Sequence, residues 1–321
     1  MLPYLGRRLL RAALLLLAVS AFSFCLFELA PGDYFEELRM DHTISQETIA
    51  ALRNHYGVDE PLALRYIRWL TSVLRGEWGF SLAYDAPAGP LLFGRARNTL
   101  VLTACAALCA WTIAVPFALW AAAGGNRLRL FANSIVAVLL SLPELIILLV
   151  FMLIAAHWHI LPSGAMTSLE FSGMTWWGKA RDLISHLVVP LAALVVAALP
   201  AVIVHTRAAV VEALNSPFIR FARANGIPRR RLLLRHALPA AANPIVTLLG
   251  LATGTLLSSS LLVEAIVGWP GLGHLLLQAL LLRDLLVVAG AVLLSSACLV
   301  LGNLLADLLL FEIDPTIREG R

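Results

Sequence analysis

The sequence predicts an all-α polytopic membrane protein with six transmembrane helices, and three observations support this fold class. The 321 residues are 60% hydrophobic and only 14% charged, and the mean hydropathy is +0.84. Six apolar runs come close to or exceed the ~20 residues that a helix needs to cross ~30 Å of hydrocarbon. Arginines gather between these runs. A soluble domain of this length would not carry so many long apolar runs.

The first apolar run, residues 12–30, follows three arginines. Residues 18–20 loosely match the cleavage site of a secretory signal, but the hydrophobicity continues past them as far as Phe27. We therefore predict a membrane helix rather than a cleaved signal. Residues 1–30 form the N-terminus and the first transmembrane helix.

Residues 31–98 are too polar for lipid but show helical patterning. Ser45 opens one predicted helix, which Gly57 ends, with Ile49, Leu52 and Tyr56 on one face. Pro61 opens another, which Gly76 ends, and its apolar face consists of Leu62, Tyr66, Trp69, Leu70 and Val73. We expect a small helical extracytoplasmic subdomain, which either caps the helix bundle or receives a partner or substrate.

The transmembrane core is expected over residues 99–315, with five more apolar runs at 99–123, 130–156, 184–206, 240–263 and 285–311. Prolines lie within or near the ends of several runs (Pro116, Pro143, Pro190 and Pro200), where neighbouring helices or water must satisfy the freed carbonyls. Glu144 is predicted to lie in the middle of a helix. An ionisable group is costly in lipid, so it faces either a cavity or a polar structural partner.

Small residues suggest close helix packing at Gly250 and Gly254, which form a GxxxG pattern. This pattern fits either an interface with a partner chain or a contact within the chain. The four cysteines, Cys25, Cys105, Cys109 and Cys298, all lie inside apolar runs and are interpreted as small core residues.

The distribution of basic residues predicts the orientation. With a cytoplasmic N-terminus, the inner short segments hold Arg7, Arg8, Arg11, Arg127, Arg129 and the seven arginines from Arg207 to Arg235. The outer short loops then hold only Lys179, Arg181 and Arg283. Because cytoplasmic loops carry the excess of basic residues, both termini are expected in the cytoplasm, together with loop 207–239 and tail 316–321.

A polar island at residues 216–239 separates two of the apolar runs. Ser216 is a candidate N-cap, Pro217 suits the first helical position and Gly226 suits a left-handed stop. We therefore predict a short helix over 217–225, with Phe218, Phe221 and Ala222 on one apolar stripe. Such a helix is not stable alone. It either lies on lipid headgroups or docks into a soluble partner.

Several chemistries are excluded or disfavoured. The only lysine, Lys179, is followed by Ala180, so no phosphate-binding Gly-Lys-Ser/Thr loop exists, and neither HExxH nor GxSxG occurs. His157 and His159 flank Trp158 at a predicted membrane boundary, where amphipathic rings are common and a metal site is disfavoured. We expect no catalytic or metal-binding residues, no cofactor and no nucleic-acid partner.

Ordered motifs along nearly the whole chain resemble the permease subunits of bacterial ABC importers for dipeptides, oligopeptides and nickel. The N-terminal half carries Pro31-Gly32-Asp33, Gly57-Val58-Asp59-Glu60-Pro61-Leu62 and Gly76-Glu77-Trp78-Gly79-Phe80-Ser81. The C-terminal half carries Ala222-Arg223-Ala224-Asn225-Gly226, Arg235-His236-Ala237-Leu238, Glu264, Trp269-Pro270-Gly271-Leu272-Gly273, Arg283-Asp284, Asn303, Asp307 and Asp314-Pro315. No single motif is specific, but the ordered string is.

The island matches the family's coupling motif in part. Ala222, Gly226, Leu238 and Pro239 hold its expected places, whereas Arg220 and Phe221 depart from its acidic start, as in the peptide branch. Asn225 stands where that branch usually has lysine, and Leu285-Leu286 replace its usual Tyr-Pro. The resemblance implies that ATPase coupling rests on Pro217, Phe218, Arg220, Phe221, Ala222, Arg223, Ala224, Gly226, His236, Leu238 and Pro239.

The resemblance implies the fold of a type I ABC importer permease in the bacterial inner membrane. A second homologous permease, two cytoplasmic ATP-binding subunits, an external solute-binding protein and membrane lipid would be its partners, and ATP hydrolysis would lie on those subunits. Peptides are the expected cargo, with nickel or another small solute as the alternative, and Glu144 would line the translocation path. A secondary transporter is the rival class, for which only Glu144, His205 and Asp307 could couple an ion.

Overall fold

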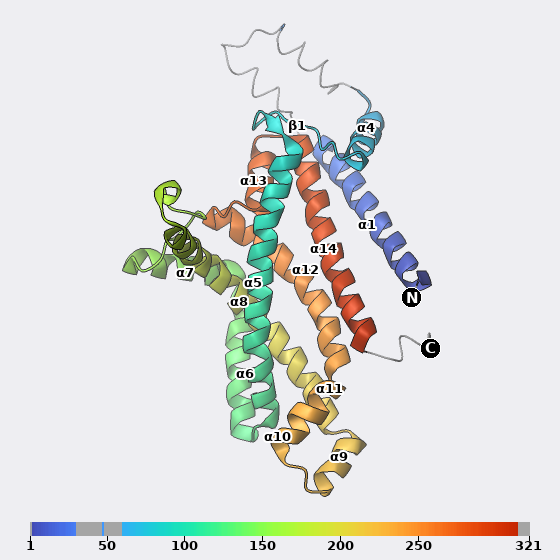
Figure 1. The fold of residues 1–321 in the computed structure, drawn as a ribbon, viewed down its shortest axis with the longest axis vertical. Coiled ribbons are helices and arrows are strands. Elements are labelled where there is room, and N and C mark those ends of the chain that lie inside the picture. Colours follow the sequence, from blue (N-terminus) through green and yellow to red (C-terminus); the bar gives the residue numbers. More distant parts are fainter. Residues whose placement is uncertain (1, 30–46, 48–59, 314–321) are drawn as a thin grey trace. The chain divides into compact units, whose positions relative to one another are not determined.

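The computed structural model describes residues 2–29, 47 and 60–313, and Figure 1 shows them as an almost entirely helical chain. The helices before the middle of the chain are α1 (Leu2–Leu29), α4 (Leu62–Leu74), α5 (Ala88–Ala123), α6 (Asn126–Ser141) and α7 (Glu144–Trp158). The later helices are α8 (Trp176–Leu214), α9 (Pro217–Ala224), α10 (Arg229–Arg231), α11 (Leu238–Ala240), α12 (Ala242–Val267), α13 (Leu272–Leu281) and α14 (Leu285–Ile313). Short strands β1 (Phe80–Ser81) and β2 (Ala86–Pro87) pair antiparallel.

Among the described residues, five helices are long and apolar enough to cross a membrane, which confirms five of the six expected spans. These helices are Gly6–Phe27, Ala88–Ala123, Trp176–Leu214, Ala242–Val267 and Leu285–Phe311. Pro116, Pro190 and Pro200 lie inside these helices without ending them. The chain is therefore a multi-pass membrane protein.

The remaining run does not form one straight helix. It divides into α6 and α7, which meet at an angle of 91°. Leu142 precedes Pro143 and has the extended backbone that a residue before proline favours (φ −91°, ψ 118°). The expectation of one continuous helix over 130–156 was wrong, because the proline ends the helix instead of being absorbed within it. Taken together, α6 and α7 remain a candidate for the sixth span.

Contacts divide the chain into two units. Unit 1 consists of Met1–Thr99 and Pro270–Cys298, and unit 2 of Leu100–Trp269 and Leu299–Arg321. The long helices α5 and α14 contribute residues to both. The expected helix over 45–57 and the motifs at 31–33, 57–59 and 314–315 lie outside the described residues.

In unit 1, α4 packs its predicted apolar face against α1 and α14. Trp69 is 6% exposed and its ring lies 4.9 Å from that of Phe24 on α1. The Tyr66 hydroxyl lies 2.9 Å from the Ser20 hydroxyl. The remaining residues of the predicted face, Leu62, Leu70 and Val73, surround the same cluster, which confirms the helical pattern inferred for this segment.

The start of α14 binds the turn region around the strands. The buried carboxylate of Asp284 accepts hydrogen bonds from Ser81 Oγ at 2.6 Å, from the Ala83 amide at 3.3 Å and from the Val287 amide at 3.3 Å. Two motifs that lie about two hundred residues apart thus meet at one side chain. The nearby Tyr84 phenol donates a hydrogen bond to Gln278 of α13 at 2.6 Å. Burial raises the pKa of this phenol, although the positive charge of Arg95 lowers it in part.

In unit 2, small residues bring α12 against the end of α14. A Cβ added at Gly250 would lie 3.0 Å from the Ala306 Cβ, and one at Gly254 would lie 2.8 Å from a Leu299 methyl. The GxxxG pattern therefore serves a contact within the chain. The cysteines are less uniform than predicted, since Cys298 is buried but Cys25 is exposed.

Candidate functional site

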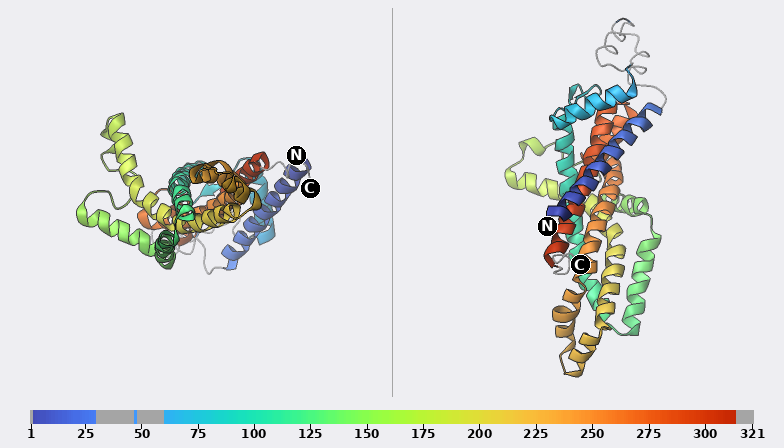
Figure 2. Two further views of the ribbon diagram at one scale, coloured as in Figure 1. Left: turned by 90° about the horizontal axis from the view of Figure 1, so that it is seen from below. Right: turned by 90° about the vertical axis from the view of Figure 1, so that its right-hand side faces the viewer.

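Residues 215–241 join α8 to α12 and form a lobe that we call the arginine lobe, because it carries six arginines. The lobe lies at one end of α8 and α12, where Figure 1 labels α9 and, following it, the helical stretch that runs from α10 to α11. The right-hand view of Figure 2 shows the same lobe at its lower end. Its core is continuous with the ends of three long helices: Ala122 of α5, Val210 of α8 and Ile245 of α12 belong to one apolar cluster with it. The lobe is therefore packed onto the spans.

The start of α9 matches the prediction in position but not in chemistry. Ser216 is the N-cap with an extended backbone (φ −66°, ψ 151°), and Pro217 is the first helical residue. However, the Ser216 hydroxyl donates to the Ala213 carbonyl at 2.6 Å and does not cap α9. The hydroxyl is a second donor to this carbonyl of the last turn of α8, which also accepts the Ser216 amide at 3.0 Å.

The end of α9 is a Schellman turn. Asn225 is the C-cap, so the helix ends one residue before the predicted 225, and Gly226 has φ +78° as expected. The Gly226 amide donates to the Arg223 carbonyl at 3.0 Å, and the Ile227 amide donates to the Ala222 carbonyl at 3.3 Å. These are the two bonds of that motif, and they fix the direction in which the chain leaves the helix.

The apolar stripe predicted on α9 is split between two environments. Ile219, which the prediction missed, is fully buried among Val210, Leu232 and Ala237, and Ala222 packs against the same cluster. Phe218 and Phe221 are 52% and 72% exposed. The spacing of Ile219 and Ala222 at i and i+3 could have revealed the anchoring face, but the two phenylalanines dominated the pattern.

The polar residues of α9 and the end of the lobe are placed around this anchor. Arg220 and Arg223 are exposed, as is Ala224, and the Arg220 guanidinium donates to the Asn215 carbonyl at 3.1 Å.

The end of the lobe contains a π turn. Leu232–Ala237 form this turn, in which the Leu238 amide donates to the Leu233 carbonyl. His236 and Leu238 are half-buried and Pro239 is exposed. A π turn of this kind is rare and is often found at functional sites.

Glu144 lies at a different kind of position from the one predicted. It is the first residue of α7, at the bend after Pro143, and not in the middle of a helix. The Ser259 hydroxyl of α12 donates to Oε2 at 2.7 Å. The other carboxylate oxygen, Oε1, is buried and has no hydrogen-bond partner among the described residues. Glu144 therefore connects the bend to α12 through one hydrogen bond.

Comparison with known proteins gives matches along the whole chain. The family described as binding-protein-dependent transport system inner membrane component matches residues 114–319, and the N-terminal family of such membrane components matches residues 1–109. The dipeptide transport system permease protein DppB of Escherichia coli is 32% identical over 100% of both chains. The oligopeptide transport system permease proteins AppB of Bacillus subtilis and OppB of Mycobacterium bovis are 31% and 29% identical, over 99% of each chain. The arginine lobe and the bend at Glu144 both lie within the first match.

Proposed function

Because the chain belongs to the family of inner membrane components of binding-protein-dependent transport systems, we propose that it forms half of the translocation path of an ATP-driven importer of di- or oligopeptides. The relatives matched end to end carry the names of dipeptide and oligopeptide permeases, which supports peptides as cargo. In this proposal the chain hydrolyses nothing itself. A second homologous permease completes the path, and an external solute-binding protein delivers the peptide.

Both termini and the arginine lobe face the cytoplasm in this proposal. The support is the bias of the short segments: the lobe holds six arginines and the start of α1 holds Arg7, Arg8 and Arg11, whereas the short loops on the other side hold only Lys179, Arg181 and Arg283. Residues 31–98 would then form the extracytoplasmic subdomain, and 207–239 the coupling loop.

The observation that carries the proposal is the exposure of Phe218 and Phe221 on a helix that is anchored through Ile219. An aromatic side chain gains about 1.5–3 kcal/mol when it is fully buried, so two exposed rings on a short helix favour a protein surface that covers them. We propose that a cytoplasmic ATP-binding subunit is that surface. Closure of two such subunits would displace the lobe, and the shared cluster would transmit the displacement to α5, α8 and α12.

The transport proposal is tested in vesicles that contain this chain, its co-encoded permease and ATP-binding subunits, and the solute-binding protein. Uptake of a labelled dipeptide is expected only when ATP is present on the side of the membrane that carries the ATP-binding subunits. A protonophore should leave this uptake unchanged. Unlabelled dipeptides should compete, whereas nickel should not. Uptake that follows a proton or sodium gradient without ATP would contradict the importer, and nickel uptake that peptides fail to inhibit would contradict only the cargo.

Glu144 is proposed to line the path and to attract the positively charged end of a peptide. Replacing it with glutamine should raise the KM for peptide uptake by about tenfold, because the attraction is lost; a factor of ten corresponds to about 1.4 kcal/mol. Ser259→Ala is the matched control, because it removes the 2.7 Å hydrogen bond but keeps the charge. If the two variants behave alike, or if Glu144→Gln leaves the kinetics unchanged for every peptide, Glu144 has only a structural role.

A further inference from the structure

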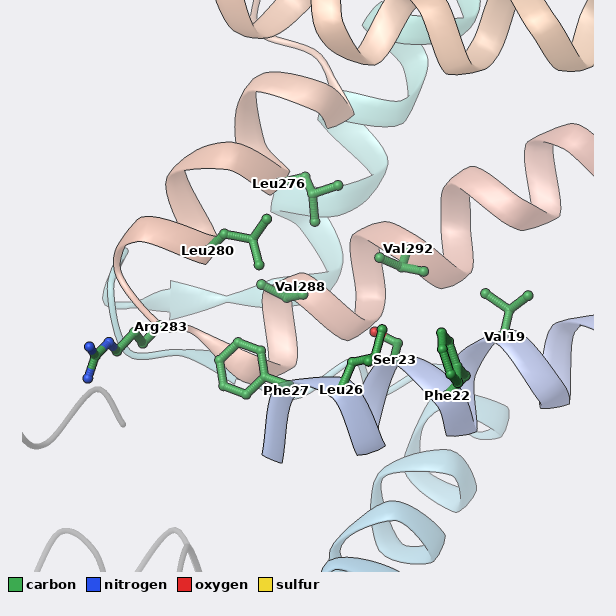
Figure 3. A pocket seen from close by; sticks show the side chains of 10 residues that line it. All are labelled: Val19, Phe22, Ser23, Leu26, Phe27, Leu276, Leu280, Arg283, Val288 and Val292. Atoms are coloured by element: carbon green, nitrogen blue, oxygen red, sulfur yellow. The ribbon is translucent and has the colours of Figure 1, made fainter. Parts of the chain in front are cut away.

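A cavity of about 380 Å³ lies in unit 1 beside the first membrane helix. Figure 3 shows its walls: side chains of α1 on one side, and side chains of α13 and the first turns of α14 on the other. The volume lies within the usual range of ligand sites. The proposed function makes no use of this cavity, since it involves neither the arginine lobe nor the bend at Glu144.

The walls of the cavity are almost entirely apolar, and Arg283 is the only charged residue among them. Several of these apolar side chains remain open to their surroundings, since Phe22 is 64% exposed, Leu26 is 51% exposed and Leu280 is 48% exposed. Because α1 is long and apolar enough to cross the membrane, its exposed Phe22 and Leu26 are expected to face hydrocarbon rather than water. An apolar ligand that enters such a groove therefore comes from the bilayer.

The length of the groove fits one half of a bilayer. Along α1 it extends from Phe27 to Val19, which is about 12 Å at a rise of 1.5 Å per residue. A single leaflet contributes about half of the ~30 Å hydrocarbon core. A transmembrane helix of another protein would need an apolar surface along the whole core, whereas one acyl chain needs only this length.

Arg283 lies at one end of the groove, and Figure 3 shows its guanidinium directed away from the apolar side chains. It occupies the left-handed position of a Schellman turn after α13, with φ +54°. The Asp284 amide donates to the Ala279 carbonyl at 2.9 Å, and the Arg283 amide donates to the Leu280 carbonyl at 3.3 Å. Glycine is the usual residue there, since a side chain in this conformation costs about 1 kcal/mol. The strained backbone points to a role for the side chain that it carries.

We propose that this groove binds a glycerophospholipid, with one acyl chain between α1 and the α13–α14 segment and the phosphate on Arg283. A guanidinium has five N–H donors and binds phosphate through two of them at once. It can therefore hold the headgroup while it keeps contacts within the chain. The bound lipid fills the space between α1 and the rest of unit 1 and becomes part of its packing.

The test uses the full chain, assembled with its partner subunits in vesicles that contain phosphatidylglycerol with a photoreactive acyl chain. After illumination, mass spectrometry of the peptides is expected to show labelling at residues 19–27 and 276–292. A photoreactive diacylglycerol, which lacks the phosphate, should label the same peptides about tenfold less. Equal labelling by the two probes would overturn the role of Arg283.

Two variants and their matched controls complete the test. Ser23→Trp places a large ring in the groove and should abolish labelling, whereas Cys25→Trp, on an exposed position of α1 outside the groove, should not. Arg283→Gln should reduce phospholipid labelling about tenfold, and Arg181→Gln, an exposed arginine elsewhere, should leave it unchanged. Wild-type labelling in Ser23→Trp, or cross-links from 19–27 to another polypeptide in place of lipid, would overturn the proposal.

Discussion

Replacing Phe221 with aspartate is expected to abolish ATP-dependent uptake and association with the ATP-binding subunits. The residue is 72% exposed in the chain, so its replacement removes little packing within the arginine lobe. A carboxylate at this position would instead have to be buried unpaired against the partner. Loss of a central contact weakens association by about 30-fold or more, since such contacts contribute at least 2 kcal/mol. Co-purification of tagged ATP-binding subunits measures the association, and vesicle uptake measures the transport.

Two further variants separate docking from folding. Phe221→Leu keeps an apolar side chain and should retain most of the association. Ile219→Asp places a charge at a fully buried position and should destabilise the lobe itself, with a lower melting temperature of the isolated chain. Phe221→Asp should melt like the wild type. Normal uptake in Phe221→Asp would refute the docking role of α9.

Replacing Asp284 with alanine is expected to cause the largest loss of stability. Its carboxylate is 3% exposed and accepts three hydrogen bonds, which join the strand region to α14. Each buried donor that loses its partner costs about 1–3 kcal/mol, so the total reaches about 3 kcal/mol or more. The melting temperature of the purified chain in detergent, followed by size-exclusion chromatography after heating, measures the effect.

The controls for this variant lie in the same unit. Glu77→Ala removes an exposed carboxylate near the strands and should leave the melting temperature unchanged. Asp284→Asn keeps one acceptor oxygen and should lie between the wild type and Asp284→Ala. Equal melting of Asp284→Ala and Glu77→Ala would show that this carboxylate does not hold the strand region.

The predictions that succeeded rest on local chemistry. The membrane runs follow from hydrophobicity over about 20 residues, the apolar face of α4 follows from spacing along one helix, and the stop at Gly226 follows from the freedom of glycine at positive φ. Each of these signals lies within one segment. The short helix α9 was therefore found with an error of one residue at its end.

The features that were missed depend on residues far apart in the sequence, or on a choice between two local solutions. A proline can bend a span or end it, and the outcome at Pro143 depends on what α7 packs against, as in the contact of Glu144 with Ser259. The burial of Ile219 is decided by α8 and the π turn. The short apolar helix α13 was not predicted, and nothing in either local segment indicated that Asp284 would bind Ser81.

The sharp turn between α6 and α7 has a consequence for what surrounds it. The last carbonyls of one helix and the first amides of the next cannot all bond within their own helices. Some find local partners: the Ile146 amide donates to the Pro143 carbonyl at 2.9 Å, and the Leu142 amide to the Leu139 carbonyl at 3.4 Å. Lipid tails have neither donors nor acceptors with which such backbone groups could form hydrogen bonds. We therefore expect the bend to lie against a polar surface, either of protein or of ordered solvent, and not directly against lipid tails.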